Sequence, residues 1–270
     1  MPDRNLRCAL SIAMAAWVLA AAAPRAADPI RILVLNMHAG KDASGKSNLD
    51  GIASLVKVHK PDLVLLQEVD RGTNRSGKVD QVAQLATATK YDSAFSASLI
   101  HYDGGEYGIA LLSRLMIGYR ATTPLRVLPV QTRAGGSHEP RVALTAIVSV
   151  RDERWRVINT HLDPANDGGR PQEVAAVVDA IHTQQTAGTP LIAGGDFNST
   201  PDNPVLQPIR DAALHDAWVE CGSGDGFTYP ADKPAKRIDY LWMSEGMHCA
   251  SAEVLDTQIS DHRPLLVTLR

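Results

Sequence analysis

Short apolar runs alternate with amphipathic stretches at both ends of this chain, and that alternation limits the folds open to it. Near the N-terminus the expected elements are a strand at 30–35, a helix at 49–60, a strand at 62–67 and a helix at 79–90. Further along, a helix at 171–185 precedes a buried strand at 190–195. Strands that alternate with helices in this way predict α/β units.

The middle and the C-terminal third follow a different pattern. Strand-like pieces separated by turn residues lie at 110–114, 116–122, 141–150 and 154–160. They imply hairpins and antiparallel pairing, so the sheet must be mixed. The last expected strands lie at 227–230, 237–243, 250–255 and 264–270. The whole pattern predicts a mixed α/β fold in which two β-sheets pack face to face with helices outside.

Length and composition favour one globular domain. The chain has 270 residues, of which 44% are hydrophobic and 21% are charged. These proportions exclude a disordered, fibrous or polytopic membrane protein, and α/β folds of this length often form a single domain. Composition does not identify an activity.

The first residues of the chain resemble a secretory signal peptide. Two arginines precede an uncharged, Ala-rich stretch at 8–23, and small residues follow it. That order is typical of export signals, and the apolar stretch is short for a membrane span. We therefore expect a signal peptide at 1–27, a folded domain at 28–270 and export to the periplasm or the medium. An uncleaved anchor is the alternative, because cleavage after Ala27 puts Arg25 where a small residue is preferred.

The chain without this segment is mildly acidic and holds two cysteines. Removal of residues 1–27 takes away three arginines and one aspartate, so the formal net charge moves from −3 to −5. Such a body lacks the basic surface of a tight, non-specific nucleic-acid binder. In an oxidising compartment Cys221 and Cys249 form either a disulfide or two buried thiols, and their spacing does not indicate a zinc site.

Polar side chains stand where the apolar runs end. Asn36, Glu68 and His161 each follow a predicted strand. Strand ends hold side chains rigidly in a crevice, where open α/β sheets place their chemistry. The carboxylate of Glu68 needs a cation or a hydrogen-bond network beside such an apolar run, and Asn36 adds an amide oxygen. A Mg²⁺ site is one interpretation, and a structural ion pair of Glu68 is the other.

Asp196 and Asn198 follow a Gly-Gly pair after another buried run. Glycines let a backbone approach a phosphate closely. There Asp196 can orient or deprotonate water while Asn198 donates to a phosphoryl oxygen. An Asx turn that caps the next helix is the alternative. His161, as an imidazolium, would stabilise the charge of a phosphorane or protonate a leaving oxygen; otherwise it is structural.

A second group of carboxylates and an imidazole comes from the C-terminal part. Asp239 lies in Arg-Ile-Asp-Tyr, and Asp261 and His262 lie in Ser-Asp-His-Arg-Pro. One carboxylate can fix the tautomer of a histidine and raise its basicity, so Asp239 would brace His262 as a general base while Asp261 faces the metal. A polar turn at a strand start is the alternative. Arg141 is suited either to bidentate phosphate binding or to an ion pair with Glu139.

Eight short motifs occur in order along the chain: LNMH at 35–38, LQEV at 66–69, YGIALLSR at 107–114, EPR at 139–141, NTHL at 159–162, GGDFN at 194–198, RIDYLW at 237–242 and SDHRPL at 260–265. Together they resemble the endonuclease/exonuclease/phosphatase superfamily, which includes pancreatic-type deoxyribonuclease, sphingomyelinases and inositol polyphosphate phosphatases. The resemblance extends over roughly residues 30–270. It implies a four-layer α/β sandwich and Mg²⁺- or Mn²⁺-dependent hydrolysis of a phosphoester by in-line attack of water.

The resemblance also assigns roles to the residues that match the family's motifs. It implies that Glu68 is the main metal ligand, with Asn36 beside it and Asp261 near the metal. It implies that Asp196 and Asn198 position water and phosphate, that His161 stabilises the transition state and that Asp239 and His262 act as the base. Abasic-site repair nucleases of this superfamily typically carry Tyr at the place of His161, so the chain differs from that branch.

We expect an exported, divalent-metal-dependent phosphodiesterase that works as a monomer without an obligate protein partner. Its substrate would be a nucleic acid, a phospholipid headgroup or a small phosphodiester. A phosphomonoesterase of the same fold and a non-catalytic ligand-binding module are the alternatives. Turnover of a bis-aryl and a mono-aryl phosphate distinguishes the two enzymes, and absence of any hydrolysis favours the module.

Overall fold

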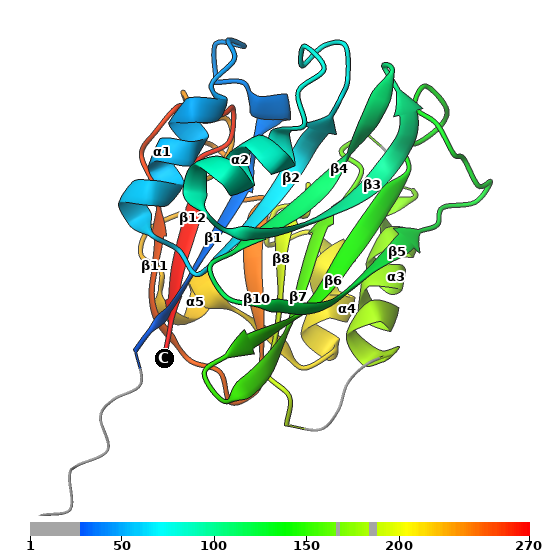
Figure 1. Ribbon diagram of the computed structural model, residues 1–270. Helices are drawn as coiled ribbons and strands as arrows, with labels where there is room; N and C mark the ends of the chain where they lie inside the picture. The colour runs from blue at the N-terminus through cyan, green and yellow to red at the C-terminus, as the bar shows by residue number, and fades with distance from the viewer. Residues whose placement is uncertain (1–27, 166–167, 184–187) are drawn as a thin grey trace, which may run out of the picture.

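Two six-stranded β-sheets lie face to face in the computed structural model of this protein (Figure 1). The structure describes residues 28–165, 168–183 and 188–270. The predicted signal peptide at 1–27 lies outside the described residues, as do the last two residues of the helix predicted at 171–185.

Each sheet is mixed, as predicted. The first has the strand order β11-β12-β1-β2-β4-β3, and the second has the order β5-β6-β7-β8-β10-β9. The strands of the first sheet are β1 (Ile30–Asn36), β2 (Leu63–Arg71), β3 (Asp92–Tyr102), β4 (Gly105–Ser113), β11 (Cys249–Val254) and β12 (Leu265–Leu269). Those of the second are β5 (Ile117–Leu125), β6 (Arg141–Val150), β7 (Glu153–His161), β8 (Leu191–Asp196), β9 (Leu214–Asp216) and β10 (Asp239–Ser244). The central pair of each sheet, β1–β2 and β7–β8, is parallel, and antiparallel strands flank it.

Strand β1 shows why a continuous apolar run forms a strand here. Successive side chains of a strand point to opposite faces, so a run that is apolar throughout serves two cores. Ile32 and Val34 are buried in the core between the sheets, whereas Leu33 and Leu35 are buried beneath the helices. Each side chain buried in this way stabilises the fold by about 1.5–3 kcal/mol.

Helices cover the outer face of each sheet (Figure 1). α1 (Leu49–His59) and α2 (Gln81–Thr89) pack on the first sheet, and α3 (Arg170–Thr183) and α4 (Gln207–Asp211) pack on the second. α5 (Ala217–Cys221) lies beside β9, β10 and β11. The predicted four-layer α/β sandwich is therefore confirmed. Across the part of the chain that the structure describes, no helix has the length and apolar character needed to cross a membrane.

The structure differs from the sequence prediction at the stretch 227–230 and at two strands that the sequence did not indicate, β3 and the short β9. The stretch at 227–230 is a loop with one isolated antiparallel bridge, between Tyr229 and Lys236. Pro230 has no N–H with which to extend this bridge into a ladder. Strand β3 is not evident from the sequence. Its many Ser and Ala residues lack the β-branched and aromatic character that marks a strand.

Cys221 and Cys249 form a disulfide, which decides between the two alternatives that the sequence leaves open. Their Cα atoms are 5.8 Å apart, and the two residues are separated by 28 positions in the sequence. The bond joins the end of α5 to the start of β11. It therefore connects an element beside the second sheet to the edge strand of the first.

Loss of the disulfide is expected to destabilise the protein. Cross-linking a loop of this length restricts the unfolded chain and contributes about 3–4 kcal/mol in the chain-entropy model. A Cys221→Ser/Cys249→Ser double variant should unfold at a lower urea concentration than the wild type. A reductant should move the wild type to the same midpoint and leave the double variant unchanged. Equal midpoints for the oxidised wild type and the variant would contradict this prediction.

Candidate active site

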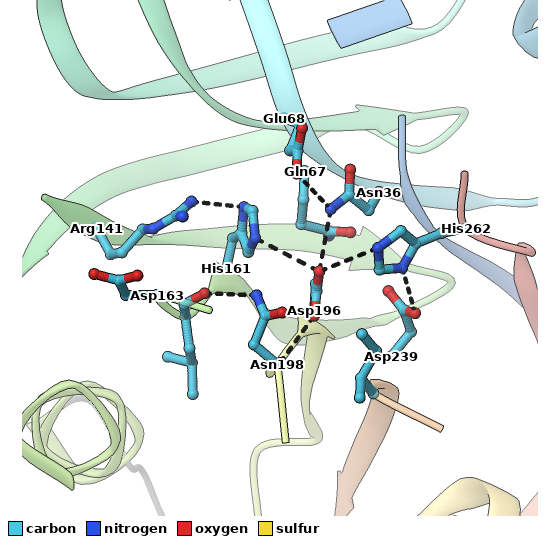
Figure 2. Close-up of polar contacts among 12 residues, drawn as sticks. Asn36, Gln67, Glu68, Arg141, His161, Asp163, Asp196, Asn198, Asp239 and His262 are labelled. Carbon is cyan, nitrogen blue, oxygen red and sulfur yellow. Dashed lines mark hydrogen bonds and ion pairs between the residues drawn. The ribbon is translucent and has the colours of Figure 1, made fainter. Parts of the chain in front are cut away.

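The strand ends of both sheets meet at one edge of the sandwich. In the parallel pairs, Asn36 of β1 lies beside Gln67 of β2, and His161 of β7 lies beside Asp196 of β8. β10 is antiparallel to β8 and begins with Asp239 beside Asp196. This register brings polar side chains from distant parts of the sequence to one place, where Figure 2 shows them converging.

His262 lies between two buried carboxylates. Its Nδ1 is 2.8 Å from Asp239 Oδ2, and its Nε2 is 3.7 Å from Asp196 Oδ2. Burial alone lowers the pKa of His262, but the charges of Asp239 and Asp196 outweigh it and raise the pKa to about 10. The imidazole is therefore protonated at neutral pH in this arrangement, and it must lose a proton before it can act as a base.

Asp196 is the carboxylate on which the two sheets converge. Its side chain accepts hydrogen bonds from Asn36 Nδ2 at 3.1 Å and from the backbone amide of Asn198 at 2.8 Å. Burial and the neighbouring charge of Asp239 raise the pKa of Asp196. Ligand atoms of Asp196, Asp239 and His262 lie within 4.8 Å of one another, which is the spacing of a group able to surround a small cation.

His161 faces Asp196 from the opposite side and is neutral. Arg141 Nη1 lies 2.8 Å from His161 Nδ1, and a guanidinium can only donate, so Nδ1 must be the acceptor. The ring proton is then on Nε2, 3.5 Å from Asp196 Oδ2. Burial, Arg141 and His262 lower the pKa of His161 well below its ordinary value. The imidazolium expected from the sequence is therefore replaced by a neutral hydrogen-bond donor.

Arg141 lies behind His161 and is not among the residues that line the cavity over the site, so the geometry does not favour direct phosphate binding by Arg141. Its guanidinium is buried, and its Nη2 is 3.1 Å from Glu139 Oε1. The ion pair with Glu139, considered from the sequence as the alternative, is present. Because the same guanidinium also contacts His161, its role here is to fix the tautomer and orientation of that ring.

Glu68 and Asn36 lie side by side on the first sheet. Asn36 Nδ2 donates to Glu68 Oε1 at 3.0 Å, and Asn36 Oδ1 accepts from the backbone amide of His38 at 3.1 Å. The amide nitrogen of Asn36 thus faces the carboxylates. For Asn36 to serve as an oxygen ligand, its side-chain amide must flip, so that Oδ1 takes the place of Nδ2.

Asn198 forms the Asx turn that the sequence left open as the alternative. Its backbone amide bonds to Asp196 Oδ1 in an Asx turn, and its side-chain nitrogen donates to the carbonyl of Leu162 at 2.8 Å. The turn is held by Arg170, which sequence reasoning missed. Arg170 donates to the carbonyls of Asn198 at 2.9 Å and Asp163 at 3.0 Å. It therefore ties the loop after β7 to the loop after β8.

A cavity of about 570 Å³ opens over these residues. Of the predicted site residues it is lined by Glu68, His161, Asp196, Asn198, Asp261 and His262. The other three predicted residues do not line the cavity but bond to residues that do: Asn36 to Glu68 and Asp196, Arg141 to His161, and Asp239 to His262. Tyr229 and Lys236 also line the cavity. Sequence reasoning missed both: it assigned Tyr229 to a strand, and Lys236 belongs to none of the motifs. The ring of Tyr229 lies 4.7 Å from that of His262, and Lys236 is the one Lys or Arg side chain among the described lining residues.

The donor set fits a hard divalent cation. Glu68, Asp196 and Asp261 present carboxylate oxygens to one cavity, and such a group repels itself unless a cation or protons compensate it. Asp239 Oδ1 is buried without a hydrogen-bond partner among the described residues. Carboxylate and amide oxygens are the ligands that Mg²⁺ and Mn²⁺ prefer.

Replacement of Asp239 by Asn should lower the pKa of His262. The substitution removes the negative charge that favours the imidazolium but keeps an oxygen able to accept from Nδ1, so the pKa should fall by about 1–3 units. Titration of the His262 ring protons by NMR in chelator-treated protein measures the change. Asp152→Asn, at an exposed position in the turn between β6 and β7, is the control and should leave the titration unaltered. An unchanged pKa in Asp239→Asn would show that Asp239 does not set the protonation of this ring.

Comparisons with known proteins agree with this architecture. The family model described as the Endonuclease/Exonuclease/phosphatase family matches residues 33–262. No curated protein sequence gives a significant match.

Solved structures resemble the chain over most of its length. An endonuclease/exonuclease/phosphatase family protein from Bacteroides thetaiotaomicron has a TM-score of 0.75 at 19% identity, covering 90% of this chain and 98% of that one. A mannosyl-6-phosphatase from the same species has a TM-score of 0.75 at 19% identity, covering 89% and 99%. The catalytic domain of human Nocturnin with bound sulfate has a TM-score of 0.70 at 22% identity, covering 90% and 94%. At these identities the similarities show the fold. Because the family model spans most of the sequence, this chain belongs to the endonuclease/exonuclease/phosphatase family.

Proposed function

We propose that the protein hydrolyses phosphodiesters with a divalent cation such as Mg²⁺ or Mn²⁺. The observation that carries the proposal is the pair of imidazoles on either side of Asp196, with His262 held by Asp239 at 2.8 Å and His161 held by Arg141 at 2.8 Å. Their neighbours give the two rings different protonation states. Such a difference separates a base from a hydrogen-bond donor at one reaction centre.

His262 is the proposed base for the attacking water. Asp239 holds Nδ1–H, so that Nε2 is the position that exchanges protons. Asp196 Oδ2, 3.7 Å from that nitrogen, accepts a hydrogen bond from the water and orients it. The water oxygen then bonds to phosphorus as the bond to the leaving oxygen breaks. The proton taken from water remains on an imidazolium that Asp239 stabilises, and the leaving oxygen takes a proton from solvent.

His161 and Asn198 are the proposed donors to the phosphoryl oxygens. His161 offers Nε2–H, and Asn198 keeps one side-chain N–H free of the bond to Leu162. Fixed donors of this kind stabilise the charge that develops on the phosphorane. Glu68, Asp196 and Asp261 would hold the cation, which would offset the charge of phosphate and carboxylates and so lower the pKa of His262.

The cavity supports a diester as substrate. At about 570 Å³ it is far larger than a phosphate group and leaves room for a substituent on each ester oxygen. Lys236 offers a cation at its wall, which suits an anionic substrate. A monoesterase is the second candidate, because one protein of the same fold is a mannosyl-6-phosphatase.

Catalytic assays with variants test the proposal. His262→Ala should lower kcat by about 10²–10⁴-fold, since it removes the base, and Glu68→Gln should abolish activation by Mg²⁺. Chelation should inactivate the wild type, and Mg²⁺ or Mn²⁺ should restore it. Exposed residues at the opposite end of the sandwich provide matched controls, His248→Ala and Glu245→Gln, which should behave as the wild type.

The substrate pair decides between the candidates. The wild type should turn over a bis-aryl phosphate faster than its mono-aryl analogue. A strong preference for the monoester would establish the monoesterase instead. Hydrolysis of neither compound, with either ion, would favour a ligand-binding module.

We also propose that the protein is exported. The basic flank, apolar stretch and small residues within 1–27 support export, and the disulfide suits an oxidising compartment. Cell fractionation followed by N-terminal sequencing should find a chain that begins near residue 28 in the periplasm or the medium. A full-length chain in the membrane fraction would indicate an anchor, and a full-length chain in the cytoplasm would contradict export.

A further inference from the structure

Strand β2 contains a bulge at the residue that supplies Glu68 to the site. Its register with β4 shifts between Leu66 and Val69, so Gln67 and Glu68 together oppose a single residue of the partner strand. The backbone of Glu68 is left-handed, with φ of 55°. A residue other than glycine keeps such a conformation only where its surroundings hold it.

The bulge decides which way Glu68 points. Val64 and Leu66 are buried beneath the helices, and regular alternation would send Glu68 to the same face. Instead Val69 occupies the core beneath the helices, and Glu68 lines the active-site cavity. The one-residue shift therefore moves a carboxylate from a helix-covered face into the site.

Asn159 of the facing sheet fills this bulge. It is 0% exposed on β7, two residues before His161, and its side chain crosses to the first sheet. Asn159 Nδ2 donates to the carbonyls of Leu66 and Ala110, both at 2.9 Å, which are the last paired residues before the shift. Its Oδ1 accepts from Gln67 Nε2 at 2.7 Å. Both hydrogens and the oxygen of one amide are thus bound to the residues that form and border the bulge.

We propose that Asn159 is a positioning residue for Glu68: it holds the bulge of β2 in the conformation that points the Glu68 carboxylate at the cation. The inference rests on the proposed role of Glu68 as a cation ligand. Asn159 acts from the sheet that carries His161 and Asp196, so it also sets the position of Glu68 relative to those groups. A purely structural amide in the core would affect stability without affecting cation affinity.

Mn²⁺ binding in the absence of substrate tests the proposal. Asn159→Asp keeps the volume but removes both donors to the carbonyls, and it should raise the Mn²⁺ dissociation constant, measured by electron paramagnetic resonance, by about tenfold or more. At saturating Mn²⁺, KM for the aryl diester should stay close to that of the wild type. Val148→Ala is the matched control, because Val148 is buried in the same inter-sheet core near the far end of β6. It should lower Tm and leave Mn²⁺ affinity unchanged.

Gln67→Met provides a second variant in case Asn159→Asp does not fold. It removes the contact to Asn159 Oδ1 and leaves the two carbonyl contacts, so a smaller rise in the same dissociation constant is expected. The proposal is overturned if folded Asn159→Asp and Gln67→Met bind Mn²⁺ as tightly as the wild type. It is also overturned if Val148→Ala, with the same Tm as Asn159→Asp, loses as much Mn²⁺ affinity. Glu68→Gln distinguishes failure of the proposed function from failure of the proposed role of Asn159. If Glu68→Gln binds Mn²⁺ as tightly as the wild type, the proposed function itself fails. If Glu68→Gln loses affinity while the Asn159 and Gln67 variants keep it, only the proposed role of Asn159 fails.

Discussion

The buried carboxylate of Asp196 is the group on which the assembly of the site depends. It is 1% exposed, and a charge buried without partners would cost several kcal/mol. Asn36 of the first sheet donates to it at 3.1 Å, while His161 and His262 flank it at 3.5 and 3.7 Å. His161 lies on the neighbouring strand of the same sheet, whereas Asn36 and His262 belong to the first sheet and to the loop between two of its strands, and they reach Asp196 only when the two sheets pack face to face. The site around Asp196 therefore forms only when the sandwich packs.

Two histidines of the site differ in charge because their neighbours differ. Burial and the neighbouring guanidinium lower the pKa of His161 and keep that ring neutral, whereas two carboxylates outweigh burial at His262 and raise its pKa. Within one cavity the fold thus provides a fixed hydrogen-bond donor and a group able to exchange a proton. A divalent cation adds charge compensation for the carboxylates that line the same space.

The strands that carry the site were predictable, because apolar runs followed by polar residues mark buried strands directly. The runs before Asn36, Glu68 and Asp196 all form central strands. Supporting residues were not predictable. Arg170 is an ordinary residue at the start of a helix until the fold places it against the carbonyl of Asn198. For Arg141 the sequence offered phosphate or Glu139 as partners, but not His161, because that contact depends on pairing between β6 and β7.

By itself the sequence determined the layered architecture, the family and the kinds of group available to the site, because periodicity, turn residues and short motifs are local properties of the chain. Only the tertiary structure decided the protonation of His161 and His262, the direction of Glu68 and the contacts of Asn159. Each of these depends on distances between residues remote in sequence and on their removal from water. A list of residues contains neither the distances nor the burial.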